Sequence, residues 1–575
     1  MPSLKHRLGG DEQPAGPWVR LVPVVGVAAL MTLSLVAKLI NRFAFFIYPD
    51  SYYYLMIAEN LRVSGSPFGT LGPGGQPFPP EGYAALKSTY PALVALVTML
   101  GVGSEAAGHI VTTLAALAAV PMAYVATRRL IGDRRAGLAA AALVATSYSL
   151  TYWSGFVMTD SVSVLLALAL LAMVARVRPD DWSNGGDLGT GLVLALLLLS
   201  RPAYIVVLPP VLWLGFGSFG WTRRRAITAA AAAALPVSLA ALLWFPPPEF
   251  AAQLLGNLLP VLGTALVVGV GVPFLLRALG RRPSAERGSA GAWWGVALAA
   301  VLPVAFALDG IIALVAGEHP LLAVHRFVLR DPAIAIALVA GAFALRKGSA
   351  RDVGVPLLVA GLTILGVYVW ADAADSRYLV HLLPFLVPVA ASAVLLVPIR
   401  TVATPPRSRV VVSVVLALAL IAAVYQGGRG FVRASVAEID TDYLHAVATG
   451  VESSVRADDV LITAVPWPYY YRLRIPTWAA SVVFADAYHD YVSADATVVV
   501  LADDALWLHY PELAGWLEEG AEDRLVREFD VSAVYGYRDA AASSGKPIRL
   551  YRMTASGLGE LVPAGYEWVP PVATQ

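Results

Sequence analysis

The chain has few charged residues and no cysteine. Charged side chains make up only 14% of its 575 residues, whereas a soluble domain carries about 25%. Hydrophobic residues reach 58%, which excludes a water-soluble globular protein and favours a chain that crosses a membrane several times. The lack of cysteine excludes disulfides, thiol nucleophiles and cysteine-ligated metals.

Two further absences narrow the range of functions. The formal net charge is only +1, so the chain lacks the basic excess that nucleic-acid-binding proteins carry. The sequence also contains no Walker-type phosphate loop and no internal repeat. These absences disfavour an ATP-driven pump and a transporter built from two similar halves.

Long apolar runs dominate the first 430 residues. A transmembrane helix needs roughly 20 apolar residues, and the runs predict thirteen spans, at 19–42, 104–127, 134–153, 161–176, 187–200, 201–220, 226–245, 252–276, 291–316, 331–346, 353–371, 378–399 and 410–426. The run Tyr90–Gly101 is too short to cross, so we expect a juxtamembrane helix there. The first run is too long for a signal peptide and lacks a cleavage site, so it is predicted to be retained.

Arginines collect in alternate loops, and this pattern predicts the orientation of the chain. Basic clusters follow every second span from the second onward, beginning with Arg128–Arg135. Because basic residues collect in cytoplasmic loops, we expect these loops and the tail 1–18 to lie in the cytoplasm. The long loop 43–103 then lies outside the plasma membrane, together with the C-terminal region.

From residue 431 the composition becomes that of a soluble module. Short apolar runs at Asp459–Ala464 and Ala496–Ala502 predict buried strands. Leu506–Glu519 is typical of a helix, and Leu525–Tyr537 and Ile548–Arg552 predict further strands. The fold class predicted is a polytopic α-helical membrane protein, with a membrane domain at 19–430 and an extracytoplasmic α/β domain at 431–575.

Two carboxylates lie beside spans on the predicted outer face. Asp50 follows the first span and precedes Tyr53 and Tyr54, and Asp160 begins the fourth span. Both positions also suit a helix N-cap, which is a purely structural alternative. Charges close to a bilayer are costly and usually serve a function. The pair could therefore provide a general base and hold an acceptor hydroxyl or a divalent cation.

Several short motifs resemble, in their order, the GT-C membrane glycosyltransferases. Asp50 with its tyrosines and Ala58-Glu59-Asn60-Leu61 resembles the first outer loop of the branch that holds protein O-mannosyltransferases and lipid A aminoarabinose transferases. Further matching points along the chain are Lys87–Pro91, Arg128–Ala136, Thr159-Asp160, Leu197–Pro202, Arg377-Tyr378-Leu379 and Val460–Tyr471. The resemblance implies thirteen spans and an outer α/β domain. O-mannosyltransferases carry Asp-Glu where this chain has Asp50-Ser51, which argues against a protein acceptor.

The resemblance also implies a reaction. A sugar would pass from a polyprenyl-phosphate donor to an acceptor hydroxyl of a cell-envelope glycan, lipid or protein, with inversion at the anomeric carbon. Asp50 would be the general base, and Asp160 would position the acceptor or the base. Cations must bind the leaving phosphate, and the candidates are Lys87, Arg201, Arg326 and Arg377, with Tyr378 beside Arg377. The sugar and acceptor pocket is expected to include Tyr53, Tyr54, Glu81, Tyr90, Glu318 and His319.

Structural alternatives exist for the basic candidates. Arg201 could snorkel at a helix end, Arg326 could lie on the polar face of an interfacial helix, and Arg377 could form a weak surface pair with Asp372 or Asp375.

No cofactor is certain from the sequence. A divalent metal (Mg, Mn or Zn) held by Asp50, Asp160 and His319 is a further hypothesis, although a metal site needs more ligands than one histidine beside one glutamate. Two other functions stay open: a transporter or lipid-linked-sugar flippase, and a non-catalytic scaffold whose C-terminal domain binds a cell-envelope polymer.

Overall fold

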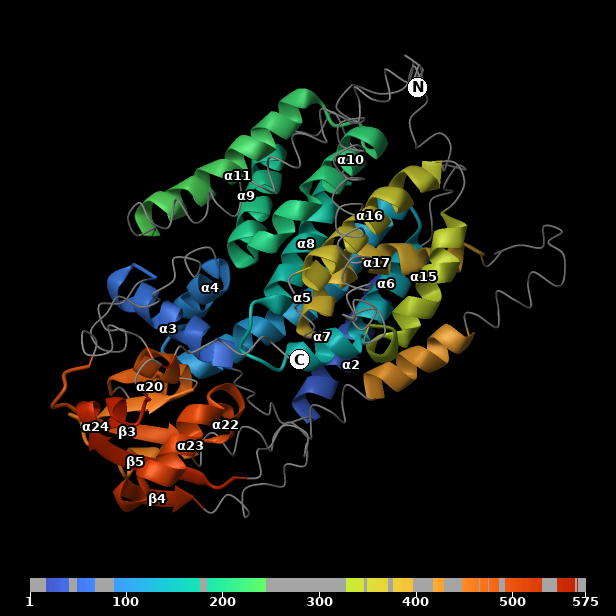
Figure 1. Cartoon of the computed structure of the whole chain (residues 1–575). Coiled ribbons are helices and arrows are strands. Elements are labelled where there is room, and N and C mark those ends of the chain that lie inside the picture. Colours follow the sequence, from blue (N-terminus) through green and yellow to red (C-terminus); the bar gives the residue numbers. More distant parts are fainter. Residues whose placement is uncertain are drawn as a thin grey trace, which may run out of the picture. The chain divides into compact units, whose positions relative to one another are not determined.

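The structure is a computed structural model of the whole chain (Figure 1). It describes residues 17–40, 49–67, 87–175, 184–244, 327–345, 349–370, 376–396, 417–428, 447–464, 466–473, 475–484, 492–529, 546–563 and 566. The chain divides into two compact units. The first, here the helical unit, comprises Met1–Phe43, Ala85–Tyr90 and Gly108–Arg433, and the second, here the mixed unit, comprises Ala44–Ala84, Pro91–Ala107 and Ala434–Gln575.

The described part of the helical unit consists of helices. In chain order they are α2 (Pro17–Ile40), α5 (Ser104–Ile131, of which the first four residues belong to the mixed unit), α6 (Arg134–Ala145), α7 (Tyr148–Trp153), α8 (Asp160–Val174), α9 (Asn184–Ser200), η3 (Pro202–Val207), α10 (Leu208–Ser218), α11 (Arg223–Trp244), α15 (Pro332–Ala344), α16 (Ser349–Trp370), η4 (Ser376–Leu382), α17 (Leu383–Ala391), η5 (Ser392–Leu396) and the helix Ala417–Gly428.

Two apolar helices among the described residues are long enough to cross a membrane, Ser104–Ile131 and Arg377–Leu396. Eight further apolar helices are 10–17 residues long. The spans predicted at 252–276 and 291–316 lie outside the described residues, and the other predicted spans fall on helical elements. The number of membrane crossings stays a prediction.

Three of the predicted spans are interrupted rather than continuous. The span expected at 134–153 is divided into α6 and α7, because the Ser147 side chain accepts a hydrogen bond from the Leu150 amide and starts a new helix. The spans expected at 201–220 and 378–399 both begin with a turn of 3₁₀ helix, η3 and η4, before their α-helices start. Turns of 3₁₀ helix are frequent at the ends of α-helices.

Small residues allow the helices of this unit to approach closely. α9 lies along α11 (Figure 1), where a side chain at Gly191 would meet the Ala229 carbonyl oxygen. On α15, a Cβ atom at Gly341 would lie 1.8 Å from the Val389 carbonyl oxygen of α17. Close backbone approach through small residues is the usual way in which membrane helices pack.

The mixed unit contains a five-stranded sheet. Its strands are β1 (Val460–Thr463), β2 (Thr477–Ala479), β3 (Thr497–Ala502), β4 (Leu525–Phe529) and β5 (Ile548–Thr554), in the order β2-β1-β3-β5-β4. β1 pairs in parallel with β2 and β3, whereas β5 pairs antiparallel with β3 and β4. The helical elements of the unit are α3 (Pro49–Ser64), α4 (Thr89–Thr98, of which the first two residues belong to the helical unit), a helix at 447–452, α20 (Pro466–Leu473), η6 (Ala480–Phe484), α22 (Asp504–His509), α23 (Pro511–Gly520), η7 (Glu522–Arg524) and α24 (Ala555–Gly559).

The described strands and helices follow the prediction with two differences, and residues 530–537 of the strand expected at Leu525–Tyr537 lie outside the described residues. β2 was not expected, because three residues carry too little pattern to indicate a strand. The helix expected at Leu506–Glu519 is two helices, since α22 ends at His509 and Pro511 starts α23. Pro511 has no amide hydrogen to continue the helix before it, so the break follows from the sequence.

The first loop and the C-terminal region belong to the same unit. Helix α3 contacts α20, where the Arg472 Nε donates a hydrogen bond of 3.1 Å to the Tyr52 hydroxyl. The rings of Tyr52 and Tyr471 lie 5.5 Å apart, centroid to centroid. The predicted outer loop is therefore attached to the C-terminal sheet region through these contacts.

We expect Gly341→Ala to destabilise the protein, because its Cβ would overlap the backbone of α17. Overpacking of this kind costs about 1–3 kcal/mol. Gly515→Ala on α23 is the matched control, since no atom lies within 4 Å of its Cβ position and Ala is the better helix former. The measurement is thermal unfolding in detergent, and equal midpoints for the two variants would contradict the close contact.

Candidate functional site

The Asp160 carboxylate is buried at the first residue of α8, with its side chain 2% exposed. Its Oδ1 lies 2.8 Å from the Arg201 Nη1 and 2.8 Å from the His381 Nε2. The helix dipole favours a negative charge at this end of a helix. Among the described residues, nothing forms a hydrogen bond to the Asp160 Oδ2. One oxygen is thus compensated, and the other is buried without a hydrogen-bond partner among the described residues.

Pro202 determines the conformation that brings Arg201 to this carboxylate. A proline disfavours the helical conformation for the residue before it, and Arg201 is extended, with φ −155° and ψ 100°. Helix α9 therefore ends at Ser200. The extended backbone at Arg201 allows its guanidinium group to reach Asp160. The Arg201 side chain is only 13% exposed.

His381 connects the carboxylate to η3. The imidazole is fully buried, and its Nδ1 lies 3.0 Å from the Tyr204 hydroxyl. A neutral imidazole with its proton on Nε2 satisfies both contacts, because Nε2 then donates to Asp160 and Nδ1 accepts from Tyr204. The four side chains therefore form a continuous chain of hydrogen bonds from Tyr204 to Arg201.

The Tyr378 ring contacts two guanidinium groups, those of Arg377 and Arg201. The Arg377 Nη2 donates a hydrogen bond of 2.7 Å to the Tyr378 hydroxyl, and its Cζ lies 4.7 Å from the centre of the Tyr378 ring. The Arg201 Cζ lies 4.8 Å from the same ring centre. Arg377 also acts electrostatically on the Asp160 carboxylate. We refer to Asp160, Arg201, Arg377, Tyr378, His381 and Tyr204 as the Asp160 cluster.

Hydroxyl groups fix the helix ends that carry this cluster. The Ser200 Oγ lies 2.6 Å from the Thr159 Oγ1 and 2.8 Å from the Ser163 Oγ. These contacts hold the first turn of α8 against the last residue of α9, one position before the Asp160–Arg201 ion pair. The two charged side chains are consequently held in place from both backbones.

Two structural alternatives do not fit this geometry. Asp160 is inside the first turn of α8, and its carboxylate contacts Arg201 and His381, so the N-cap interpretation of Asp160 is wrong. Thr159 occupies the cap position without capping, because its hydroxyl is bonded to Ser200. Arg201 does not snorkel to a surface, because it is paired with a buried carboxylate. Asp372 and Asp375 lie outside the described residues.

The first predicted acidic residue lies in the mixed unit. Asp50 is the second residue of α3, and its side chain lies outside the described part of the structure. Further along α3, Tyr54 is buried and Tyr53 is half-buried. Burial raises the pKa of Tyr52 to about 12, although the Arg472 guanidinium opposes this shift. Tyr52 therefore stays neutral at physiological pH and is a poor general base.

Lys87 and Tyr90, two of the predicted site residues, lie in the helical unit. Tyr90 is fully buried, and its hydroxyl lies 3.1 Å from the Gly108 carbonyl oxygen and 3.0 Å from the Thr112 Oγ1. These contacts tie its segment to α5, and the Tyr90 side chain also interacts electrostatically with the Asp160 carboxylate. Lys87 is half-buried just before this segment. The remaining predicted residues, Glu81, Glu318, His319 and Arg326, lie outside the described residues.

Sequence reasoning missed His381 and Tyr204. An ionisable residue inside an apolar run is a functional signal in membrane proteins, and His381 stands in the run Leu379–Pro384. Tyr204 has a weaker signal, because an isolated tyrosine in an apolar segment is ordinary. Only the meeting of η3 and η4 gives it a role.

Comparisons with known proteins give one family match and several similar solved structures. Residues 89–247, which include Asp160, Arg201 and Tyr204, match the family described as dolichyl-phosphate-mannose-protein mannosyltransferase. The chain is similar to the crystal structure of the Archaeoglobus fulgidus oligosaccharyltransferase in its apo form, with a TM-score of 0.56 and 14% identity over 87% of this chain and 71% of that one. It is also similar to apo ArnT from Cupriavidus metallidurans, with a TM-score of 0.51 and 12% identity over 92% of this chain and 99% of that one.

The chain has the GT-C fold. The resemblance to the GT-C membrane glycosyltransferases that the motifs indicate is therefore confirmed at the level of the fold. A further structure of the same ArnT is bound to undecaprenyl phosphate, with a TM-score of 0.51 and 12% identity over 94% of this chain and 99% of that one. No curated protein matches this chain.

The hypothesis of a bound divalent metal can be compared with one similar structure and with the described residues of this chain. The archaeal oligosaccharyltransferase was also solved in complex with zinc and sulfate; this structure has a TM-score of 0.51 and 13% identity, covering 86% of the present chain and 69% of that one. The residues that the structure describes here include no group of three or more histidine, aspartate or glutamate side chains that could hold an ion. Asp160 could supply one oxygen, whereas zinc sites in proteins have three or four protein ligands. The described residues thus do not make a metal site by themselves.

We expect Tyr204→Phe to destabilise this GT-C chain although it deletes a single oxygen. The substitution leaves the buried Nδ1 of His381 without its donor, and an unsatisfied buried polar group costs about 1–3 kcal/mol. Tyr425→Phe is the matched control, because Tyr425 is exposed. Thermal unfolding in detergent compares the two, and an equal response would show that the Tyr204–His381 contact is unimportant.

Proposed function

We propose that the protein is a membrane glycosyltransferase that moves a sugar from a polyprenyl-phosphate donor to an acceptor hydroxyl, at the outer face of the plasma membrane. The observation that carries the proposal is the cluster of two arginines around the buried Asp160 in a chain with the GT-C fold. Undecaprenyl phosphate bound to the similar ArnT supports a lipid phosphate as the group that this chain binds.

The charge of the Asp160 cluster suits a phosphate group. Arg201 and Arg377 bring two positive charges, Asp160 brings one negative charge, and a neutral His381 leaves a formal excess of +1. Electrostatic interactions between buried charges are stronger than those between exposed charges, because the interior has a lower dielectric constant. Guanidinium groups bind phosphate oxygens through geometrically matched pairs of donors. A polyprenyl phosphate would complete the compensation of these charges.

In the proposed reaction, the leaving group is the polyprenyl phosphate, and its negative charge must be stabilised. The acceptor oxygen attacks the anomeric carbon while the bond from that carbon to the phosphate oxygen breaks, and the electron pair remains on the phosphate. The polyprenyl phosphate thus gains a negative charge in the transition state, and fixed cations such as Arg201 and Arg377 stabilise that charge. The configuration at the anomeric carbon is inverted.

Two carboxylates have separate tasks in the proposed reaction. Asp50 removes the proton of the acceptor hydroxyl, a role that rests on the sequence resemblance. Asp160 positions a substrate hydroxyl through Oδ2, which accepts no hydrogen bond from the described residues. Its Oδ1 is occupied by Arg201 and His381, so Asp160 is a poor proton acceptor and a good positioning group.

We expect Asp50→Asn to lower kcat by about 10²- to 10⁴-fold, which is the usual contribution of a general base. The measurement is transfer of labelled sugar from a polyprenyl-phosphate donor by the purified full chain. Glu59→Gln provides a control on the same helix, because Glu59 forms an ion pair with Arg62 of that helix. Equal turnover in Asp50→Asn and wild type would remove the base assignment.

The same assay separates the enzyme from the alternative functions. A transporter or lipid-linked-sugar flippase would use the same phosphate-binding arginines without breaking the bond to the sugar. It would release no polyprenyl phosphate and would instead move the intact donor across vesicle membranes. That result would replace the proposal of sugar transfer.

We expect Arg377→Gln to lower kcat by about 10²- to 10³-fold, as loss of one donor to a developing anion does. Tyr378→Phe retains the ring and removes the hydroxyl that accepts from Arg377, so its loss should stay below about tenfold. Steady-state rates and thermal midpoints are measured together. An unchanged kcat in a stable Arg377→Gln protein would exclude Arg377 from the phosphate site.

A further inference from the structure

A cavity of about 630 Å³ lies between α2, α5 and α6, and none of its lining residues belongs to the Asp160 cluster. Its lining residues are Pro23, Val24, Val27, Ala28 and Met31 of α2, Pro121, Tyr124, Val125 and Arg128 of α5, and Arg134 of α6. We call this cavity the α2–α5 groove. The groove is apolar along most of its length, and both of its charged lining residues are arginines.

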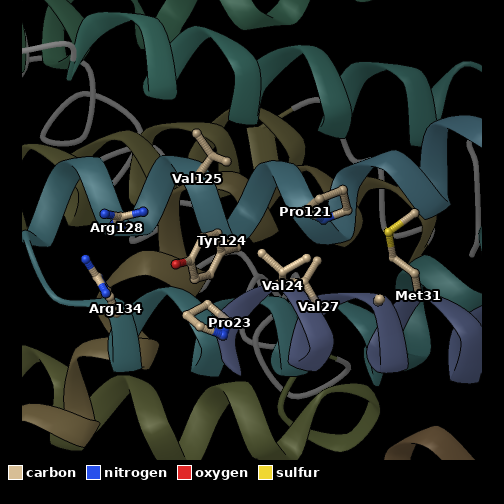
Figure 2. A pocket seen from close by; sticks show the side chains of 10 residues that line it. Pro23, Val24, Val27, Met31, Pro121, Tyr124, Val125, Arg128 and Arg134 are labelled. Atoms are coloured by element: carbon tan, nitrogen blue, oxygen red, sulfur yellow. The ribbon is translucent and has the colours of Figure 1, made fainter. Parts of the chain in front are cut away.

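The polar and apolar parts of the groove are separated along the helices. Figure 2 shows Arg128 and Arg134 together at one end, and Pro121, Val27 and Met31 toward the other. The Tyr124 hydroxyl points toward the arginine end in the same view (Figure 2). This distribution matches an amphiphile, with an anionic headgroup at the arginines and hydrocarbon along α2 and α5.

The shape of the groove follows from the sequence. Proline inside a helix removes a backbone hydrogen bond and bends the helix, and Pro23 of α2 and Pro121 of α5 both line the groove. Gly137 of α6 leaves room for the Tyr124 ring, since a Cβ there would lie 2.8 Å from it. The groove is therefore built by particular residues and is more than a gap between two regular helices.

None of the ten residues that line the groove is acidic. The nearby Asp133 accepts hydrogen bonds from the backbone amides of Arg135 and Ala136 and from the Arg135 guanidinium, which occupies its carboxylate. Arg128 also lies in the last turn of α5, where a helix favours a cation.

We propose that the α2–α5 groove binds an anionic phospholipid of the leaflet that faces the cytoplasm, with its phosphate at Arg128 and Arg134. The leaflet follows from the predicted orientation, in which the loop between α5 and α6 is cytoplasmic. The proposal is independent of the proposed sugar transfer, because the donor is expected at the opposite face. Each arginine near an anionic headgroup strengthens binding severalfold.

The test uses native mass spectrometry of the purified full chain with phosphatidylglycerol or phosphatidylcholine added to the detergent. We expect wild type to retain phosphatidylglycerol in preference to phosphatidylcholine. The double variant Arg128→Gln/Arg134→Gln should bind phosphatidylglycerol about 30-fold more weakly. Arg224→Gln/Arg225→Gln is the matched control, because it removes the same charge from the first turn of α11, on the same predicted face.

A second variant tests the apolar part of the groove with both arginines retained. Ala28→Trp fills the groove on α2, where Ala28 is exposed, and should displace the lipid without changing the charge. The last measurement uses glycerol 3-phosphate, which has the phosphate group but no hydrocarbon. A site that recognises phosphate alone would bind glycerol 3-phosphate as tightly as it binds the lipid.

Three results would overturn the proposal. They are equal retention of the two lipids, equal loss in the two arginine variants, and binding of glycerol 3-phosphate that matches the lipid. If the Arg128/Arg134 variant does not fold, Ala28→Trp decides the question by itself, because retention of phosphatidylglycerol in that variant also contradicts the proposal.

Discussion

The helical unit depends on the compensation of one buried carboxylate. Asp160 carries its charge into the interior, where an unpaired ion costs several kcal/mol. A single oxygen of Asp160 contacts Arg201 after α9 and His381 in η4, so three segments far apart in the sequence must meet at one atom. The same constraint brings together the groups that we propose bind a phosphate and a substrate hydroxyl.

Part of this site could be predicted from short motifs and part could not. The motifs indicated Asp160, Arg201, Arg377 and Tyr378, because charged residues beside apolar runs are conspicuous. They gave no indication that Arg201 pairs with Asp160, since the two residues are 41 positions apart. His381 was overlooked because it stands among leucines and valines, and its meaning depends on which polar groups the fold brings to its two nitrogens.

The fold shows the same division between local pattern and distant contact. Apolar runs located the helices, and Pro511 and Ser147 explain two of the breaks that the runs did not reveal. The pattern of apolar residues could not show that α3 belongs with residues 434–575, because that association rests on contacts such as Arg472 with Tyr52 across 420 positions. Hydropathy describes the environment of a segment and not its neighbours.

The attachment of α3 to α20 has a consequence for evolution and for protein engineering. Tyr52 from the first loop and Ser104 after it both contact α20, at Arg472 and Tyr471 respectively. The C-terminal region is therefore not an independent module that can be exchanged between relatives. A chimaera that replaces residues 434–575 alone would leave these partners facing foreign side chains, so the first loop and the C-terminal region must be inherited or swapped together.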